Sequence, residues 1–214
     1  MSYPIHSNAA LTARIRLRRR ARGYAVGPPD ADAAYCWRMD APLLPPEDDK
    51  DWTWVLSRPC PDCGYDPAGV DSSALAGLVA DAVAPWAGVL ARDDVRTRPA
   101  PQVWSPLEYA CHVRDALTIF AGRVRLMLDQ HEPTFPNWDQ DGAAVEQRYW
   151  EQDPAAVAGE VEQAGAEFAQ ALARVRPADW SRPGLRSNGS RFTVESIGVY
   201  FLHDLRHHLW DVHG

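Results

Sequence analysis

The sequence predicts an all-α protein: a four-helix bundle with an irregular N-terminal extension. Four stretches of helical length carry apolar residues at helical spacing. Three of them begin with a residue that caps helices well, and no stretch gives a convincing pattern for a sheet. The 214 residues suffice for one sizeable domain and a tail.

The second predicted helix has the clearest start. Ser105-Pro106-Leu107-Glu108 forms a capping box with proline at the first helical position. Pro85 lies inside the first helix and should bend it, because proline removes a backbone donor. In chain order the expected helices are residues 71–91, 105–130, 153–176 and 193–212.

The connections bear on topology. Residues 131–153 are long enough to cross the bundle, with a short helical piece near 143–150, whereas the 180–191 connection is rich in Gly, Pro and Ser. If the first of these does cross, helices two and three are parallel and helix four is antiparallel to both. That arrangement would bring the second turn of helix two level with the last turns of helix four, which a simple up-down-up-down bundle would separate.

The last helix carries the most informative side chains. His203 and His207 are four residues apart, so their imidazoles share one face and form a platform for a divalent metal. A third ligand must come from elsewhere, and His112 in the second turn of helix two is the predicted one. His208 points about 100° away from His207 and is expected to take no part.

Ordinary interpretations stay open for these residues. A histidine pair at this spacing is also compatible with a plain surface, and its side of the helix carries a mixed lining: Ser196, Val199, Tyr200, Arg206 and Trp210. Glu108 either completes the capping box or orients His112. Tyr200, Arg206, Trp104 and Asp115 are candidate pocket residues.

Residues 51–70 contain a cysteine motif. Asp51 to Leu56 is expected to be extended, and Cys60-Pro61-Asp62-Cys63-Gly64 has the form of half a zinc ribbon. The other half is missing, because Cys36 and Cys111 are single. Three interpretations remain: zinc held with a histidine, a redox dithiol, or a tight turn with two reduced thiols.

Residues 1–50 are expected to be an irregular or disordered tail. Arg14 to Arg22 is basic and is followed by a Pro- and Asp-rich run. An arm for nucleic acid or for an anionic surface is one interpretation, and a solvated extension is favoured.

Composition excludes several functional classes. The net charge of −7 argues against general nucleic-acid binding. No apolar run approaches 18 residues and no signal peptide is recognisable, so no membrane partner is expected. Four cysteines make no disulfide framework, and a reducing cytoplasm is the expected location.

With these motifs in place, the sequence resembles the DinB-like family, which includes the N-terminal domain of mycothiol-dependent maleylpyruvate isomerase and the bacillithiol transferases. The resemblance covers about residues 71–213 and rests on Trp104 to His112 and on His203-x-x-x-His207. It implies an up-down-down-up bundle with zinc or nickel near one end, held by three such side chains and open to further ligands. The tail and the cysteine motif lie outside that pattern.

The expected function is that of a metal-dependent thiol S-transferase, in which His112, His203 and His207 hold the ion and a low-molecular-weight thiol such as mycothiol attacks an electrophilic substrate. Homodimer formation is left open, and no general base is identified. The alternatives are a metal-dependent hydrolase and a non-catalytic metal-binding bundle for stress response or partner binding.

Overall fold

The computed structural model describes residues 42–46 and 50–213. The predicted tail, with Arg14 to Arg22 and Cys36, lies outside the described residues except for 42–46 and 50. The predicted domain boundaries therefore stay a prediction.

The predicted helices are present, with small shifts at their ends. The first one was expected to bend because of Pro85, and it is interrupted there and gives two helices. Ser105 and Glu108 make the complete capping box of α4, and Thr193 and Ser196 exchange hydrogen bonds at the start of α7. The bounds are α2 Leu75–Val83, α3 Trp86–Leu90, α4 Pro106–Asp129, α5 Gln140–Glu146, α6 Pro154–Ala173 and α7 Val194–His213.

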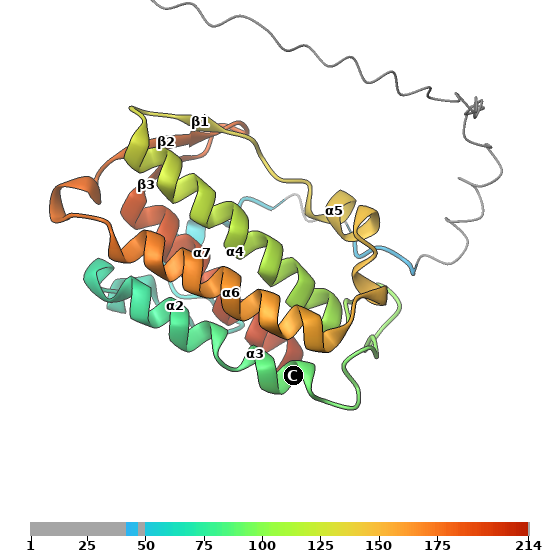
Figure 1. The fold of residues 1–214 in the computed structure, drawn as a ribbon. Helices are drawn as coiled ribbons and strands as arrows, with labels where there is room; N and C mark the ends of the chain where they lie inside the picture. The colour runs from blue at the N-terminus through green and yellow to red at the C-terminus, as the bar shows by residue number, and fades with distance from the viewer. Residues whose placement is uncertain (1–41, 47–49, 214) are drawn as a thin grey trace, which may run out of the picture. The chain divides into compact units, whose positions relative to one another are not determined.

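The bundle is up-down-down-up, which confirms the predicted topology. Figure 1 shows α4 and α6 running in the same direction, with α7 and the α2–α3 pair running in the opposite one. The connection between α4 and α6 passes along the bundle through a short strand and α5. As a result the beginning of α4 lies level with the end of α7.

The core is formed where all these helices meet. Phe201 of α7 stacks on Phe120 of α4, with ring centroids 4.2 Å apart, and meets Phe168 of α6 edge-on. Two glycines let helices approach closely. A Cβ on Gly165 of α6 would lie 2.8 Å from Val83, and one on Gly198 would lie 2.9 Å from Leu75.

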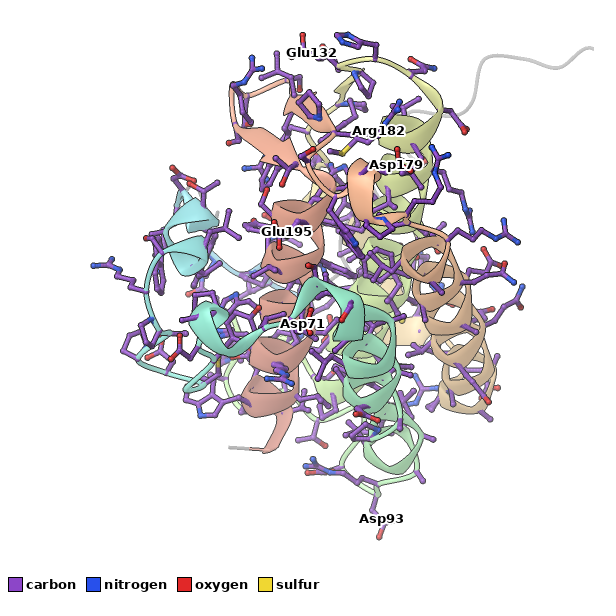
Figure 2. The ribbon with its side chains drawn as sticks, turned by 90° about the vertical axis from the view of Figure 1, so that its left-hand side faces the viewer. Asp71, Asp93, Glu132, Asp179, Arg182 and Glu195 are labelled. Carbon is purple, nitrogen blue, oxygen red and sulfur yellow. The ribbon has the colours of Figure 1, made fainter. Side chains whose placement is uncertain are left out.

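A small sheet at one end of the bundle was not predicted. Its strands are β1 Thr134–Phe135, β2 Pro183–Arg186 and β3 Arg191–Thr193. The first pair is parallel and the second antiparallel. Arg182 donates to the carbonyl oxygens of Met127 and Gln130, which ties the sheet to the end of α4 (Figure 2). Such short strands carry too few residues for an alternating pattern to be recognised.

The segment before the cysteine motif differs from expectation. Trp52–Leu56 is a 3₁₀ helix, so the prediction of an extended segment was wrong. Asp51 accepts a hydrogen bond from the backbone N–H of Thr53 and starts the turn. The helix packs against α7, where Trp52 and Trp54 contact His203.

Residues 72–90 are long and apolar enough to cross a membrane, judged by length and composition alone. In the structure they include the break at Pro85, and Leu75, Val79 and Trp86 are fully buried. Because α2 packs on α6 and α7, this segment is a core element of the bundle.

Candidate metal centre

A cavity of about 650 Å³ lies between the beginning of α4 and the end of α7. The chain around Trp138 completes its walls, together with Pro45, Pro46, Lys50 and Trp52. The acidic residues that line it are Asp139, Asp141, Asp204 and Asp211, and the basic ones are Lys50, Arg123 and Arg186. The imidazoles and carboxylates on its α7 side form a site suited to a cation.

His112, Asp204 and His208 form the first donor group, which we call the open group. Nε2 of His112 lies 3.8 Å from Oδ2 of Asp204, and Nε2 of His208 lies 3.7 Å from Oδ1 of the same carboxylate. One donor atom from each residue lies within 4.8 Å of the other two. All three residues line the cavity.

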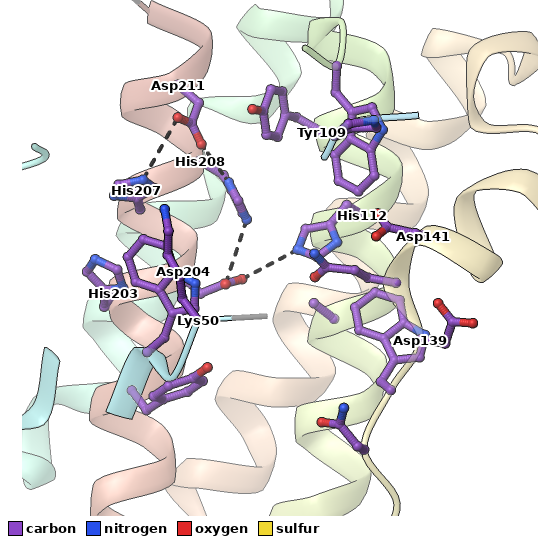
Figure 3. Close-up of a pocket in the computed structure, with 18 of the residues that line it drawn as sticks. Lys50, Tyr109, His112, Asp139, Asp141, His203, Asp204, His207, His208 and Asp211 are labelled. Carbon is purple, nitrogen blue, oxygen red and sulfur yellow. Dashed lines mark hydrogen bonds and ion pairs between the residues drawn. The ribbon is translucent and has the colours of Figure 1, made fainter. Parts of the chain in front are cut away.

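The backbone explains why these residues meet. The capping box fixes the start of α4, so His112 is held in its second turn. Asp204 and His208 are four residues apart and therefore share one face of α7. The antiparallel arrangement of α4 and α7 places that face opposite His112 (Figure 3).

Neighbouring side chains orient the open group. Asp211 lies 2.8 Å from Nδ1 of His208, and this contact directs the other ring nitrogen of His208 towards Asp204. Trp138 stacks on His112 with 5.2 Å between ring centroids, and Trp104 packs at 5.4 Å. These contacts fix the positions of both imidazole rings, with Nε2 of each ring facing Asp204.

Cys60, Cys63, His203 and His207 form the second donor group, which we call the closed group. One donor atom from each residue lies within 4.8 Å of the others. Sγ of Cys60 is 3.7 Å from Nδ1 of His207. Cys60 is 2% exposed and His203 is 4% exposed. The cysteine motif and α7 thus meet in a partly buried cluster whose two histidines also line the cavity.

A row of polar contacts connects the two groups along α7. Asp211 lies between His207 and His208, at 3.9 Å from Nε2 of His207, and Asp204 lies between His208 and His112 (Figure 3). The rings of His207 and His208 are 6.1 Å apart. The two groups are therefore neighbours that share no ligand.

Burial controls the protonation of these side chains. It lowers the pKa of His112, and together with the nearby His207 it lowers the pKa of His203 to about 4. Burial alone would raise the pKa of Asp204, but His208 and His112 outweigh it and lower the pKa to about 2. Neutral imidazoles and an ionised carboxylate are the forms that bind metals.

The Cys63 thiol does not have the character of a redox centre. Burial and the neighbouring sulfur of Cys60 raise the pKa of Cys63. A reactive dithiol needs the opposite shift, because the thiolate is the nucleophile. The raised pKa of Cys63 gives the redox interpretation no support from this residue, and that interpretation stays a prediction.

The structure divides the three histidines predicted as ligands. His203 and His207 lie together, but with the two cysteines, whereas His112 lies with Asp204 and His208. Successive residues on a helix point about 100° apart, and the face towards α4 is that of 204 and 208. His208, expected to take no part, is thus placed in the open group. That one ion is held by His112, His203 and His207 together stays a prediction.

The other residues predicted to line or support the site lie in different places. Trp104 and Tyr200 line the cavity. Asp115 lies elsewhere, bonded to the Tyr149 hydroxyl and to Gln147. The Arg206 guanidinium lies over the ring of Tyr65. Glu108 serves the capping box and pairs with Arg98, as its first interpretation predicted.

Both groups fit a divalent ion. In each group one donor atom from every residue lies within 4.8 Å of the others, so small side-chain movements would bring them to the separation of about 3.3–3.8 Å between ligand atoms on a tetrahedral zinc ion. Nδ1 of His112 and Nε2 of His203 are buried and have no hydrogen-bond partner among the residues that the structure describes. Imidazole, thiolate and carboxylate are all zinc ligands.

The fold is thus a four-helix bundle with two groups of potential metal donors around its last helix. The DinB superfamily model matches residues 77–212, and the chain belongs to this superfamily. A solved structure of YfiT from Bacillus subtilis, titled a probable metal-dependent hydrolase with an unusual four-helix bundle topology, is similar in fold. It is 16% identical with a TM-score of 0.61, and the match covers 70% of this chain and 90% of that one. No curated protein matches.

Proposed function

We propose that this protein is a divalent-metal-dependent enzyme whose reacting ion is held by His112, Asp204 and His208. One observation supports this most strongly: three donors from two helices converge on the wall of a cavity of about 650 Å³. Three protein ligands leave a tetrahedral ion with a position for water or substrate, which is the pattern of catalytic zinc sites.

The bound ion would act as a Lewis acid that lowers the pKa of a coordinated thiol or water. The chain's own residues supply the positioning. Asp211 holds His208 in the tautomer that presents Nε2 to the site, and Asp204 supplies a negative charge. The indoles of Trp104 and Trp138 pack on the ring of His112 and hold it in place.

Thiol transfer is the reaction that we propose for this site. A polar thiol such as mycothiol would place its sulfur near the open group, and the cavity would also receive an electrophilic partner. Two features are consistent with such ligands: the volume of the cavity, and the cations Lys50, Arg123 and Arg186 in its walls. Zinc and nickel are the proposed ions.

Hydrolysis is the second candidate, because a protein of the same fold is titled a probable metal-dependent hydrolase. A water in place of the thiol would use the same residues. The two reactions require the same ligands and differ only in the group that occupies the open position.

Metal analysis and turnover of His112→Ala test the proposal, with His131→Ala as the matched control. His131 is exposed and is not part of either group. We expect His112→Ala to lose the ion of the open group and its activity, while the control keeps both. Unchanged metal content in His112→Ala would contradict the proposal.

The substrate assay has two arms. Metal-loaded protein is incubated with mycothiol and a soluble electrophile, and separately with activated esters and amides. Conjugate formation supports thiol transfer, and cleavage without added thiol supports hydrolysis. No turnover in either arm, with the ion bound, would favour a non-catalytic binding bundle.

A further inference from the structure

We propose that Cys60, Cys63, His203 and His207 bind a second, structural zinc ion, separate from the reacting ion. The four residues come from two segments about 140 residues apart in sequence and bring their donor atoms within 4.8 Å of one another. The inference goes beyond the proposed function, because it assigns the cysteine motif, which the enzymatic site does not use.

The donor set argues for zinc and for a structural role. Two sulfurs and two imidazole nitrogens make the Cys₂His₂ set of closed zinc sites, in which the protein supplies all four ligands. Thiolates also select zinc over magnesium or calcium. Binding would displace one proton from each thiol, and the imidazoles would bind in their neutral form.

The turn that presents the sulfurs is already formed. The backbone N–H of Gly64 donates to the Cys60 carbonyl at 3.0 Å, and the N–H of Cys60 donates to the Tyr65 carbonyl at 2.8 Å. Gly64 has a φ of +71°, a conformation that favours glycine. These bonds bring Cys63 back beside Cys60, so both sulfurs face the same point.

The histidine side of the group is equally ordered. His203 and His207 lie one turn apart on α7, with ring centroids 5.1 Å apart. The buried Nε2 of His203 has no hydrogen-bond partner within the described chain, which leaves a polar atom that a ligand role would satisfy. Nδ1 of His207 faces Cys60 at 3.7 Å.

A second contact docks the motif on α7 independently of any ion. The Tyr65 hydroxyl donates to the Val199 carbonyl at 2.7 Å, and this bond is buried. The motif is thus held in place beside the histidines at two points, the tyrosine and the donor group.

The proposed zinc ion would also fix one wall of the cavity. Trp52 lines that cavity and packs on both His203 and His207, at 5.8 and 5.6 Å between ring centroids. A clamp between the motif and α7 would hold the preceding 3₁₀ helix in position. Loss of the closed ion should therefore weaken substrate binding while the reacting ion stays bound.

The decisive experiment uses full-length His112→Ala loaded with zinc, because this variant removes the open group and leaves the closed one. We expect one zinc per chain, and zinc-edge X-ray absorption with two sulfur neighbours at about 2.3 Å. A bound ion with only nitrogen and oxygen neighbours, or no bound ion, would overturn the inference.

Cysteine variants provide the complement in an otherwise wild-type chain. Cys63→Ser should lose one of two zinc ions and retain the one that His112 helps to hold, whereas Cys111→Ala should keep both. Cys111 is a buried cysteine of α4 outside both groups, so it controls for the loss of a core thiol. Two zinc ions in Cys63→Ser would contradict the proposal.

Thiol labelling of the wild type avoids any folding defect of the variants. With zinc bound, Cys60 and Cys63 should resist alkylation, and a strong chelator should expose both while Cys111 stays protected. Equal labelling of Cys60 and Cys63 before and after chelation would overturn the inference.

Discussion

The two donor groups on α7 lie side by side but differ in ligand number and chemistry. The closed group has two sulfurs and two imidazoles, with Cys60 and His203 buried, and its two histidines line the same cavity as the open group. The open group has two imidazoles and one carboxylate on the wall of a cavity. Four ligands complete the coordination of zinc, whereas three leave room for a reactant.

The difference shows how one helix can serve two ions. His203 and His207 face the cysteine motif, and Asp204 and His208 face α4, because each pair repeats at four residues and the pairs are offset by one. All three histidines predicted as ligands keep that role in our proposals, but they are divided between two ions.

The largest expected effect is that of His112→Ala on activity. Removal of one of three ligands should lower kcat/KM by more than about 100-fold, because even residues outside the coordination sphere cost 10–100-fold. Steady-state assays with added metal measure this change. Tenfold or smaller loss would mean that the open group is not the reacting site.

The stability of the metal-free protein should depend on pH through His203. Its pKa is lowered to about 4 in the folded state, by burial and by the nearby His207. Between about pH 6.5 and 4 the imidazole of residue 203 is protonated in the unfolded chain, whose pKa is the ordinary value of about 6.5, but stays neutral in the folded chain. Stability should therefore fall as the pH drops from about 6.5 to 4, by about 3 kcal/mol.

Denaturant unfolding of metal-free wild type and His203→Gln across that range measures this contribution. The free energy of unfolding of the variant should depend less steeply on pH, because the contribution of His203 is gone. Some dependence should remain, since the pKa of His112 is also lowered in the folded state. Identical slopes in the two proteins would show that residue 203 is not buried in its neutral form.

Asp211→Asn tests whether the carboxylate between the two groups supports the open group more than the closed one. The bond to Nδ1 of His208 is 2.8 Å, and the contact with His207 is 3.9 Å. We expect metal affinity to fall about 10–100-fold at the open group and less at the closed one. Competition with a chromophoric chelator, in the His112→Ala and Cys63→Ser backgrounds, separates the two constants. A greater loss at the closed group would reverse our assignment.

Tyr65→Phe should have the smallest effect. It removes one buried hydrogen bond to Val199, which should cost about 1 kcal/mol. Hydrogen exchange should rise in residues 52–66 and stay unchanged in α4, because the bond docks only the cysteine motif. Uniform loss of protection across the bundle would show that this motif is part of the global core.

The fold was largely predictable because its signals are local. The capping box at Ser105 and Glu108, Pro85 and the helical spacing of apolar residues each depend on neighbours in sequence. The parallel arrangement of α4 and α6 followed from the length of the connection between them. The 3₁₀ helix at Trp52 to Leu56 was missed, because its contacts are with α7, more than 140 residues away.

The site was only partly predictable from the sequence. The importance of α7 was visible in its histidines, but which face meets α4 depends on the rotation of a packed helix. The pattern Asp204-x-x-x-His208 was present beside His203-x-x-x-His207, and Asp211 three residues after His208 was the available signal. The approach of Cys60 to His207 is a long-range contact that spacing alone does not reveal.

Anomalous diffraction at the zinc edge from crystals of the zinc-loaded full-length protein tests the two-ion account most directly. Two peaks are expected for each chain: one among Cys60, Cys63, His203 and His207, and the other among His112, Asp204 and His208. A single peak shared by His112, His203 and His207, with the cysteines unliganded, would contradict the division of α7 between two ions.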